Sequence, residues 1–159
     1  MAGIRKIINY KSEVINDIKN SDKIISLISG TPNIDMTSEA AKKIINENFL
    51  NYTFNEESCS NDKCAVYVEC KMNDTSSCRI NNIEIIVQII SAESILKLDK
   101  EKFPNIDCNR NDAIAAEIAE LIDGADIGVG ELRLIESAPC DSPAGTSLLQ
   151  LRFAANDFR

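Results

Sequence analysis

The apolar run at residues 79–92 limits the possible folds more than any other segment. Its side chains alternate between two faces of an extended strand, and both faces are apolar. One face carries Ile83, Ile85, Val87 and Ile89, and the other carries Ile86 and Ile90. A strand of this kind lies at the centre of a sheet, or its second face is covered by a helix or by another subunit.

The first 50 residues are predicted to be helical. Apolar residues recur at spacings of three and four over residues 3–29, and the pattern breaks at Asn20-Ser21-Asp22. Ser21 or Asp22 caps a second helix, which Gly30 ends. A third short helix follows residues 35–38, with Ala41, Ile44 and Ile45 facing inward and Leu50 near its end.

The rest of the chain reads as two hairpins separated by a helix. Strands are predicted at 65–71 and 79–92, then at 131–137 and 147–154, with a polar loop at 55–63 and a turn at 139–145. Between the hairpins, a helix at about 110–123 is capped by Asp107 or Asn109 and stopped by Gly124. Its buried stripe is Ile114, Ile118, Leu121 and Ile122.

These elements predict one α+β domain over residues 1–159. Residues 1–50 form its helical part, and residues 64–159 form a mostly antiparallel four-stranded sheet packed by the helix at about 110–123. A chain of this length can bury a sizeable core without a second domain.

Composition excludes several classes of function. The chain has 17 Lys and Arg against 25 Asp and Glu, a formal charge of −8, and no His. It therefore lacks the basic excess with which proteins grip phosphates, the usual general base, and the usual ligand of catalytic zinc. Neither a signal peptide nor a membrane span is expected, so we expect the protein to be synthesised in the cytoplasm and to stay there at first.

Charge is distributed unevenly along the chain. Residues 1–24 carry five bases against three acids, whereas residues 99–136 carry ten acids against four bases. Solvated helix faces account for this pattern. Alternatively, the basic end of one subunit docks on an acidic surface of another, and an acidic surface lining a channel repels passing DNA.

Four of the six cysteines are candidates for a zinc site. Cys59, Cys64, Cys70 and Cys78 have a spacing close to that of zinc sites. However, Cys64 and Cys70 bracket a predicted strand, and six residues of strand separate them by about 20 Å. A shared metal is therefore the least favoured interpretation.

Other uses of the cysteines stay open. Cys70 and Cys78 flank one hairpin loop and could form a disulfide, and Cys59 could pair with Cys64 at the other end. Free or buried thiols are favoured, because cytosolic synthesis keeps cysteines reduced. Cys108 and Cys140 stand alone near loops and are expected to pack as small apolar side chains.

The remaining candidates have structural explanations. The Gly128-Val129-Gly130 motif follows a helix and precedes a strand, the reverse of a phosphate-binding loop, so a turn is predicted. The acids Asp99, Asp107 and Asp112 lie around a helix start, where capping explains them. We therefore predict no catalytic residue, no cofactor and no enzymatic activity.

The second half of the chain, about residues 67–158, resembles small neck proteins of tailed bacteriophages and prophages, above all the tail-terminator group. The resemblance rests on the first strand pair, a polar connection, a helix opening Asn109-Arg110-Asn111-Asp112, the Gly128-Val129-Gly130-Glu131-Leu132 segment and a closing strand. Such proteins commonly have an R-x-D-x-hydrophobic helix start before the final hairpin. Arg110, Asp112 and Ile114 match it. The cysteine-bearing loop 55–78 is outside the pattern.

The resemblance implies a structural virion protein, assembled in the host cytoplasm. Copies would form a ring, usually of six, that ends the tail tube and joins it to the head connector. Its partners would be further copies, tail tube or sheath proteins and connector proteins, with DNA passing through the lumen and no membrane contact. A head-closure or tail-completion ring of the same neck is an alternative, and a cytoplasmic acidic adaptor or inhibitor is an alternative of another class.

Overall fold

The computed structural model describes residues 2–50, 62–75, 80–128 and 130–158. The N-terminal part contains the helices α1 (Ala2–Lys19), α2 (Asp22–Ser29) and α3 (Glu39–Glu47) and the two-residue strand β1 (Phe49–Leu50). The hairpin strands β2 (Cys64–Thr75) and β3 (Ile80–Ala92), the single turn α4 (Glu93–Leu96) and the helix α5 (Arg110–Ile122) follow. The chain ends with the strands β4 (Arg133–Cys140) and β5 (Thr146–Phe158).

The α+β class is confirmed, but the sheet has five strands rather than four. Its order is β1-β2-β3-β5-β4, and β1 runs parallel to β2 while all other pairs are antiparallel. The sequence predicts Leu50 near the end of a helix, whereas α3 ends at Glu47 and Leu50 pairs with Tyr67 in β2. A strand of two residues has no periodicity that a sequence pattern could reveal.

Both predicted hairpins are present, and β2, β4 and β5 are longer than expected. β4 begins at Arg133 instead of residue 131, and it continues through Pro139 and Cys140, which we had assigned to the turn. A proline at position 139 is compatible with strand structure because β4 is an edge strand. Its outer side has no neighbouring strand, so no hydrogen bond is lost there when an N–H is missing.

The helix ends follow their local sequence. The Ser21 hydroxyl accepts a hydrogen bond from the Ile24 N–H, and Gly30 closes α2 in the left-handed region with φ of +76°. At α5, Asn109 is the cap, and its side-chain oxygen accepts the Asp112 N–H at 2.8 Å. Asp107 instead pairs with Lys100, and the hydrogen bond from Lys100 lowers the pKa of Asp107.

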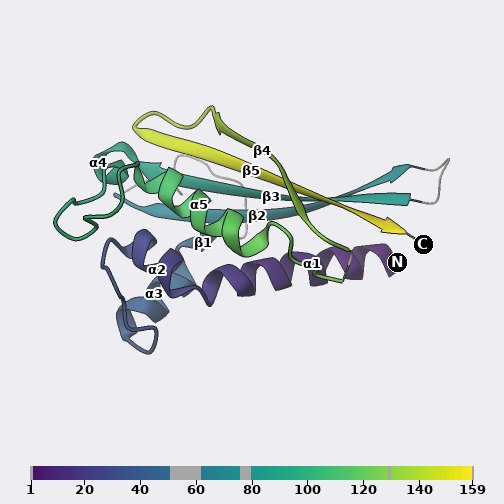
Figure 1. Ribbon diagram of the computed structural model, residues 1–159, viewed down its shortest axis with the longest axis horizontal. Helices are drawn as coiled ribbons and strands as arrows, with labels where there is room; N and C mark the ends of the chain where they lie inside the picture. Colours follow the sequence, from purple (N-terminus) through teal and green to yellow (C-terminus); the bar gives the residue numbers. More distant parts are fainter. Residues whose placement is uncertain (1, 51–61, 76–79, 129, 159) are drawn as a thin grey trace.

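The helices lie on one face and along one edge of the sheet. In Figure 1, α5 crosses in front of the strands, and α1 runs beside β2, the strand that β1 pairs with at only two positions. Beyond the two positions paired with β1, the outer edge of β2 is therefore covered by α1 and is not left open.

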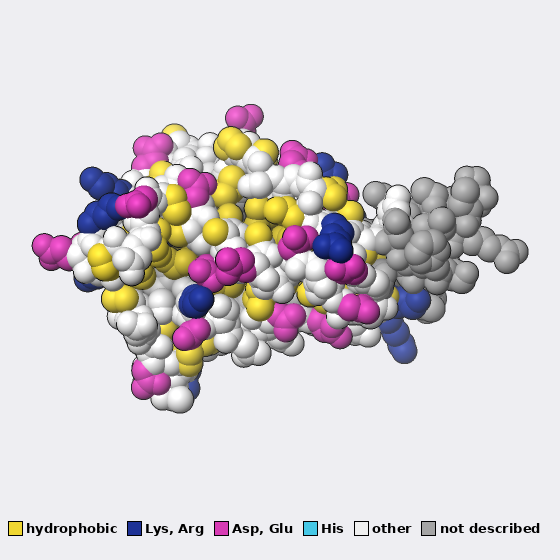
Figure 2. Space-filling view, in the orientation of Figure 1, with side chains coloured by type: hydrophobic (Ala, Val, Ile, Leu, Met, Phe, Trp, Pro, Cys, Tyr) yellow, Lys and Arg dark blue, Asp and Glu magenta, His cyan; other side chains and the backbone are white. Residues whose placement is uncertain are grey.

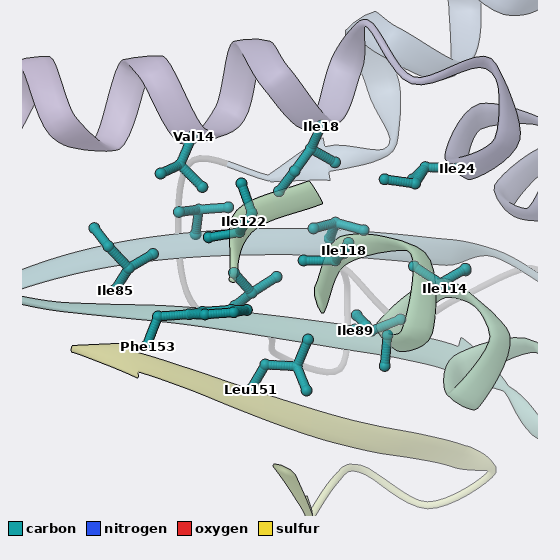
Figure 3. Close-up of a cluster of buried hydrophobic side chains, with 14 of the residues drawn as sticks. Val14, Ile18, Ile24, Ile85, Ile89, Ile114, Ile118, Ile122, Leu151 and Phe153 are labelled. Carbon is teal, nitrogen blue, oxygen red and sulfur yellow. The ribbon is translucent and has the colours of Figure 1, made fainter. Parts of the chain in front are cut away.

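The core lies between this face of the sheet and the helices (Figure 3). It takes Ile114, Ile118 and Ile122 from α5, but Leu121, which we had placed in the buried stripe, is 39% exposed. The remaining labelled side chains in Figure 3 are Val14, Ile18, Ile24, Ile85, Ile89, Leu151 and Phe153.

The central position predicted for residues 79–92 is confirmed. β3 pairs with β2 on one side and with β5 on the other. On the face away from the main core, Ile90 belongs to a small apolar cluster with Ala65 and Leu148, and Ile86 is also buried. No helix among the described residues has the length and apolar character to cross a membrane.

A pair of substitutions in α5 tests this packing. Ile118→Ala should lower the free energy of unfolding by about 2–5 kcal/mol, because Ile118 is fully buried and the change leaves a cavity. Leu121→Ala should cost less than about 1 kcal/mol, because its side chain is partly in solvent already. Urea unfolding of both variants measures the difference, and equal losses would contradict the assignment of the core face.

Candidate functional site

The helix start that carries the phage-like motif is a structural anchor. Arg110 is 8% exposed, and its guanidinium donates three hydrogen bonds to main-chain oxygens. Nη1 donates to the carbonyls of Leu27 at 2.7 Å and Ile28 at 3.1 Å, and Nε donates to the carbonyl of Ile95 at 2.9 Å. Arg110 thereby ties the start of α5 to the end of α2 and to α4.

The location of these acceptors explains why an arginine suits the position. The last carbonyls of a helix have no partner within the helix and carry a partial negative charge. Burial lowers the pKa of Arg110, yet a guanidinium stays charged at neutral pH. Among the described residues, no carboxylate pairs with Arg110, so the helix end itself compensates the buried charge.

Gly30 makes room for this contact. A Cβ at Gly30 would lie 3.3 Å from Nη2 of Arg110, and the φ of +76° already favours glycine. The residue that ends α2 therefore also admits the guanidinium.

The other two motif residues have different surroundings. Asp112 is exposed in the first turn of α5, where a negative charge suits the helix dipole. Ile114 is fully buried in the core. Arg110, Asp112 and Ile114 thus act as anchor, first-turn acid and core residue, and the structure does not bring their side chains together as a chemical site.

A second buried contact at this helix start was not anticipated. Asn111 is 2% exposed; its amide donates to the carbonyl of Ser147 at 2.9 Å, and its oxygen accepts the hydroxyl of Ser91 at 2.6 Å. Asn111 therefore fixes α5 to the ends of β3 and β5. A polar residue directly after a helix cap resembles a solvent-facing one in sequence, so only the fold identifies this role.

The structure places the cysteines as the strand argument required. Cys64 and Cys70 lie at separate positions of β2, and they pair in register with Ser91 and Ile85. The structure shows no disulfide among Cys64, Cys70, Cys108 and Cys140. Within the described ranges, no cluster of three or more Cys, Asp or Glu side chains could hold a metal. Cys59 and Cys78 lie outside the described residues, so the disulfide of Cys70 with Cys78 stays a prediction.

The two thiols of β2 are poor nucleophiles. Burial raises the pKa of Cys64 and of Cys70 to about 11. Nearly all of each thiol is protonated at neutral pH, and the thiolate is the reactive form.

Glycines 128 and 130 form a turn, as predicted. The Asp126 carboxylate accepts the Gly128 N–H at 2.8 Å and the Gly130 N–H at 3.2 Å, and both glycines have positive φ. The donors that a phosphate-binding loop would offer to a ligand are therefore occupied by a side chain of the turn itself.

On the face of the sheet away from the helices, charged side chains bridge three strands. Arg152 of β5 forms ion pairs with Glu84 of β3 and, at 2.5 Å, with Glu136 of β4. These two carboxylates raise the pKa of Arg152, and the largest cause is the hydrogen bond that Arg152 donates to Glu84. Beside them, the Gln88 amide donates to Gln150 at 2.9 Å. This network favours one strand register.

A hollow of about 590 Å³ lies beside α3. Asp35, Lys43 and Glu47 line it together with small polar side chains of the loop before α3. The Asp35 carboxylate is held by Thr37, whose hydroxyl and N–H donate to it at 2.7 and 2.9 Å and lower its pKa. Asp35 therefore stabilises the loop before α3 and is not positioned to bind a ligand.

Replacing Arg110 tests the anchor. Arg110→Met should lower the free energy of unfolding by at least about 2 kcal/mol, because it leaves three buried carbonyls without a donor. Arg133→Met, which removes an exposed ion pair with Glu131, should cost less than about 1 kcal/mol. Thermal and urea unfolding compare the two, and a fully stable Arg110→Met variant would contradict the anchor.

Thiol labelling tests the cysteine environments. Iodoacetamide at pH 8 should modify exposed Cys108 and leave Cys64 and Cys70 unmodified until urea is added. Because the folded pKa of both thiols exceeds 9.0, the folded state holds protons that the unfolded state releases, so stability should fall as pH rises from 9 towards 11. Peptide mapping identifies the modified residues, and rapid labelling of folded Cys64 would refute the assigned burial.

Three comparisons place the chain among known proteins. A search of curated proteins finds no match. Among solved structures, a chain of the "Virion of native gene transfer agent (GTA) particle" matches with a TM-score of 0.50 and 11% identity, and the match covers 90% of each chain. At this identity the match demonstrates a shared fold. The YomW family model matches residues 3–153, nearly the whole sequence, and the protein therefore belongs to the YomW family.

Proposed function

We propose that this protein is a structural component of a phage-type virion. The main support is the structural match, which covers 90% of this chain and 90% of a chain from a gene transfer agent particle. Membership of the YomW family and the phage-like helix start at Arg110 point in the same direction. The family model starts at residue 3 and so includes the N-terminal helices, which gave the sequence resemblance only weaker support.

Within the virion, we propose a ring in the neck that ends the tail tube and joins it to the head connector. The order of elements, with a motif-bearing helix before a final hairpin, supports the tail-terminator position, and a head-closure or tail-completion ring of the same neck is the alternative. The partners are further copies of the chain, tail tube or sheath proteins and connector proteins.

The electrostatics suit a ring through which DNA passes. With a formal charge of −8, the chain cannot neutralise many phosphates, so contact with DNA releases few counterions and retention is weak. An acidic lumen repels the duplex and lets it slide.

The proposed role needs no catalysis. The chain has no His, and the Cys64 and Cys70 thiols are protonated at neutral pH. The buried polar side chains Arg110 and Asn111 bond to the protein's own main chain. These groups are committed to holding elements together, as expected for a scaffold.

Mass in solution is the first test. The purified full chain of 17.5 kDa should sediment as an oligomer, with six copies giving about 105 kDa, and should image as rings. The same rings should bind the tail tube or connector proteins of their own phage and should not retain duplex DNA at physiological salt.

A protein that stays monomeric at all concentrations and ignores other virion proteins would overturn the proposal. Capture of a basic nucleic-acid enzyme in place of virion proteins would favour an acidic inhibitor that mimics DNA.

A further inference from the structure

The inner face of the sheet is left open beside β4. A groove of about 230 Å³ runs between α5 and β4, and it is lined by Ala115, Ala116, Ala119, Leu134, Leu149 and Leu151. Next to it on β4, Ile135 is 53% exposed, and Leu134 itself is 37% exposed. Figure 2 shows hydrophobic side chains on this face of the molecule. Within the described parts of the chain, no element covers this apolar position of the sheet beside α5.

The edge of β4 is unsuited to pairing with a further strand. The β4–β5 register shifts between Leu134 and Glu136, which leaves Ile135 as an irregularity, and Pro139 lacks an N–H. Bulges and prolines are devices that block strand addition at an edge. A partner at this edge therefore docks through side chains, as a helix does.

A matching apolar projection lies at the opposite edge of the sheet. Ile4 and Ile8 of α1 are 63% and 55% exposed, and they stand one turn apart on the same side of the helix. Lys11 follows Ile8 on that side, and its Nζ lies 5.5 Å from the ring centroid of Tyr67 on β2. Because β2 and β4 lie on opposite sides of β3, one chain cannot bring its own projection to its own groove.

Charge favours the same pairing. Residues 4–11 carry three bases and no acid, whereas residues 112–136 carry seven acids and one base. Asp112 lines the groove at the start of α5, and Asp123 at its end accepts the Leu134 N–H at 2.9 Å. The projection is therefore basic, and the groove has acidic groups at both ends.

We propose that the first turns of α1 from one copy dock in the α5–β4 groove of the next copy, with Ile4 and Ile8 against the groove and the bases near Asp112 and Asp123. The occupant is a second copy, because the two surfaces complement each other and every chain carries both. Such a head-to-tail contact uses two different patches, so it generates a closed ring when the rotation between copies closes. This interface rests on the proposed ring function and specifies how its subunits join.

Two variants separate the halves of the contact. The first, Ile4→Asp with Ile8→Asp, damages the projection. The second, Ala116→Arg with Leu134→Asp, blocks the groove at one lining position on α5 and one on β4. Each alone should be monomeric, with half-assembly shifted to roughly tenfold higher concentration or more. An equimolar mixture should form a dimer and nothing larger, because one intact projection and one intact groove remain. Leu121→Ser, an exposed apolar position outside the groove lining, is the matched control and should assemble like the wild type.

The outcomes distinguish this interface from the ring itself. Wild-type rings together with assembling variants, or a mixture that stays monomeric, would overturn the interface and leave the ring proposal standing. A wild type that stays monomeric, alone and with its virion partners, would overturn both. Circular dichroism and thermal unfolding of each variant ensure that a monomeric result reflects lost docking rather than lost folding.

Discussion

The buried guanidinium of Arg110 is the interaction on which the helical layer depends. Removing a charge from water costs several kcal/mol unless the protein supplies partners. Here the partners are three main-chain carbonyls from two separate segments, the end of α2 and α4. Once these contacts form, the start of α5 can occupy only one place. From that start, helical geometry directs Ile114, Ile118 and Ile122 into the core and leaves Ala116 at the groove beside β4.

The sheet has a comparable organising element in β3. Its inner side chains pack under the helices, while its outer side chains alternate between the apolar cluster around Ile90 and the polar network around Glu84. If the register of β3 shifted by one residue, its inner and outer side chains would change places, and Glu84 would be buried in the core. Inner packing and outer ion pairs thus favour the same register, and the long β2–β3–β5 sheet is rigid enough to present two distinct edges.

Sequence patterns predicted the elements that carry strong local signals and missed those set by tertiary contacts. The central strand, both hairpins and the end of α2 at Gly30 were recognisable because periodicity and capping act within a few residues. The caps were each narrowed to two candidates, of which the structure selects Ser21 and Asn109. β1 was missed because two residues hold no period, and Leu121 was misplaced because a helical stripe does not tell how wide the covering layer is. The motif residue Arg110 was found by resemblance alone. Its three acceptors lie up to 83 residues away in sequence, so no local pattern could show what it binds.

If copies join through the proposed interface, the exposed apolar side chains meet two opposing demands, because the protein must then be soluble before it assembles. A single large apolar patch would drive indiscriminate association, whereas separate small patches at opposite edges stay soluble and gain binding only when two copies meet in one orientation. The basic start of α1 and the acidic stretch from α5 to β4 add directional attraction and penalise contacts between like edges. The irregular β4 edge removes strand pairing as a competing route of association. In the proposed interface, the helix along one edge and the groove beside the other therefore specify one orientation between copies, because a single chain cannot join its own two surfaces.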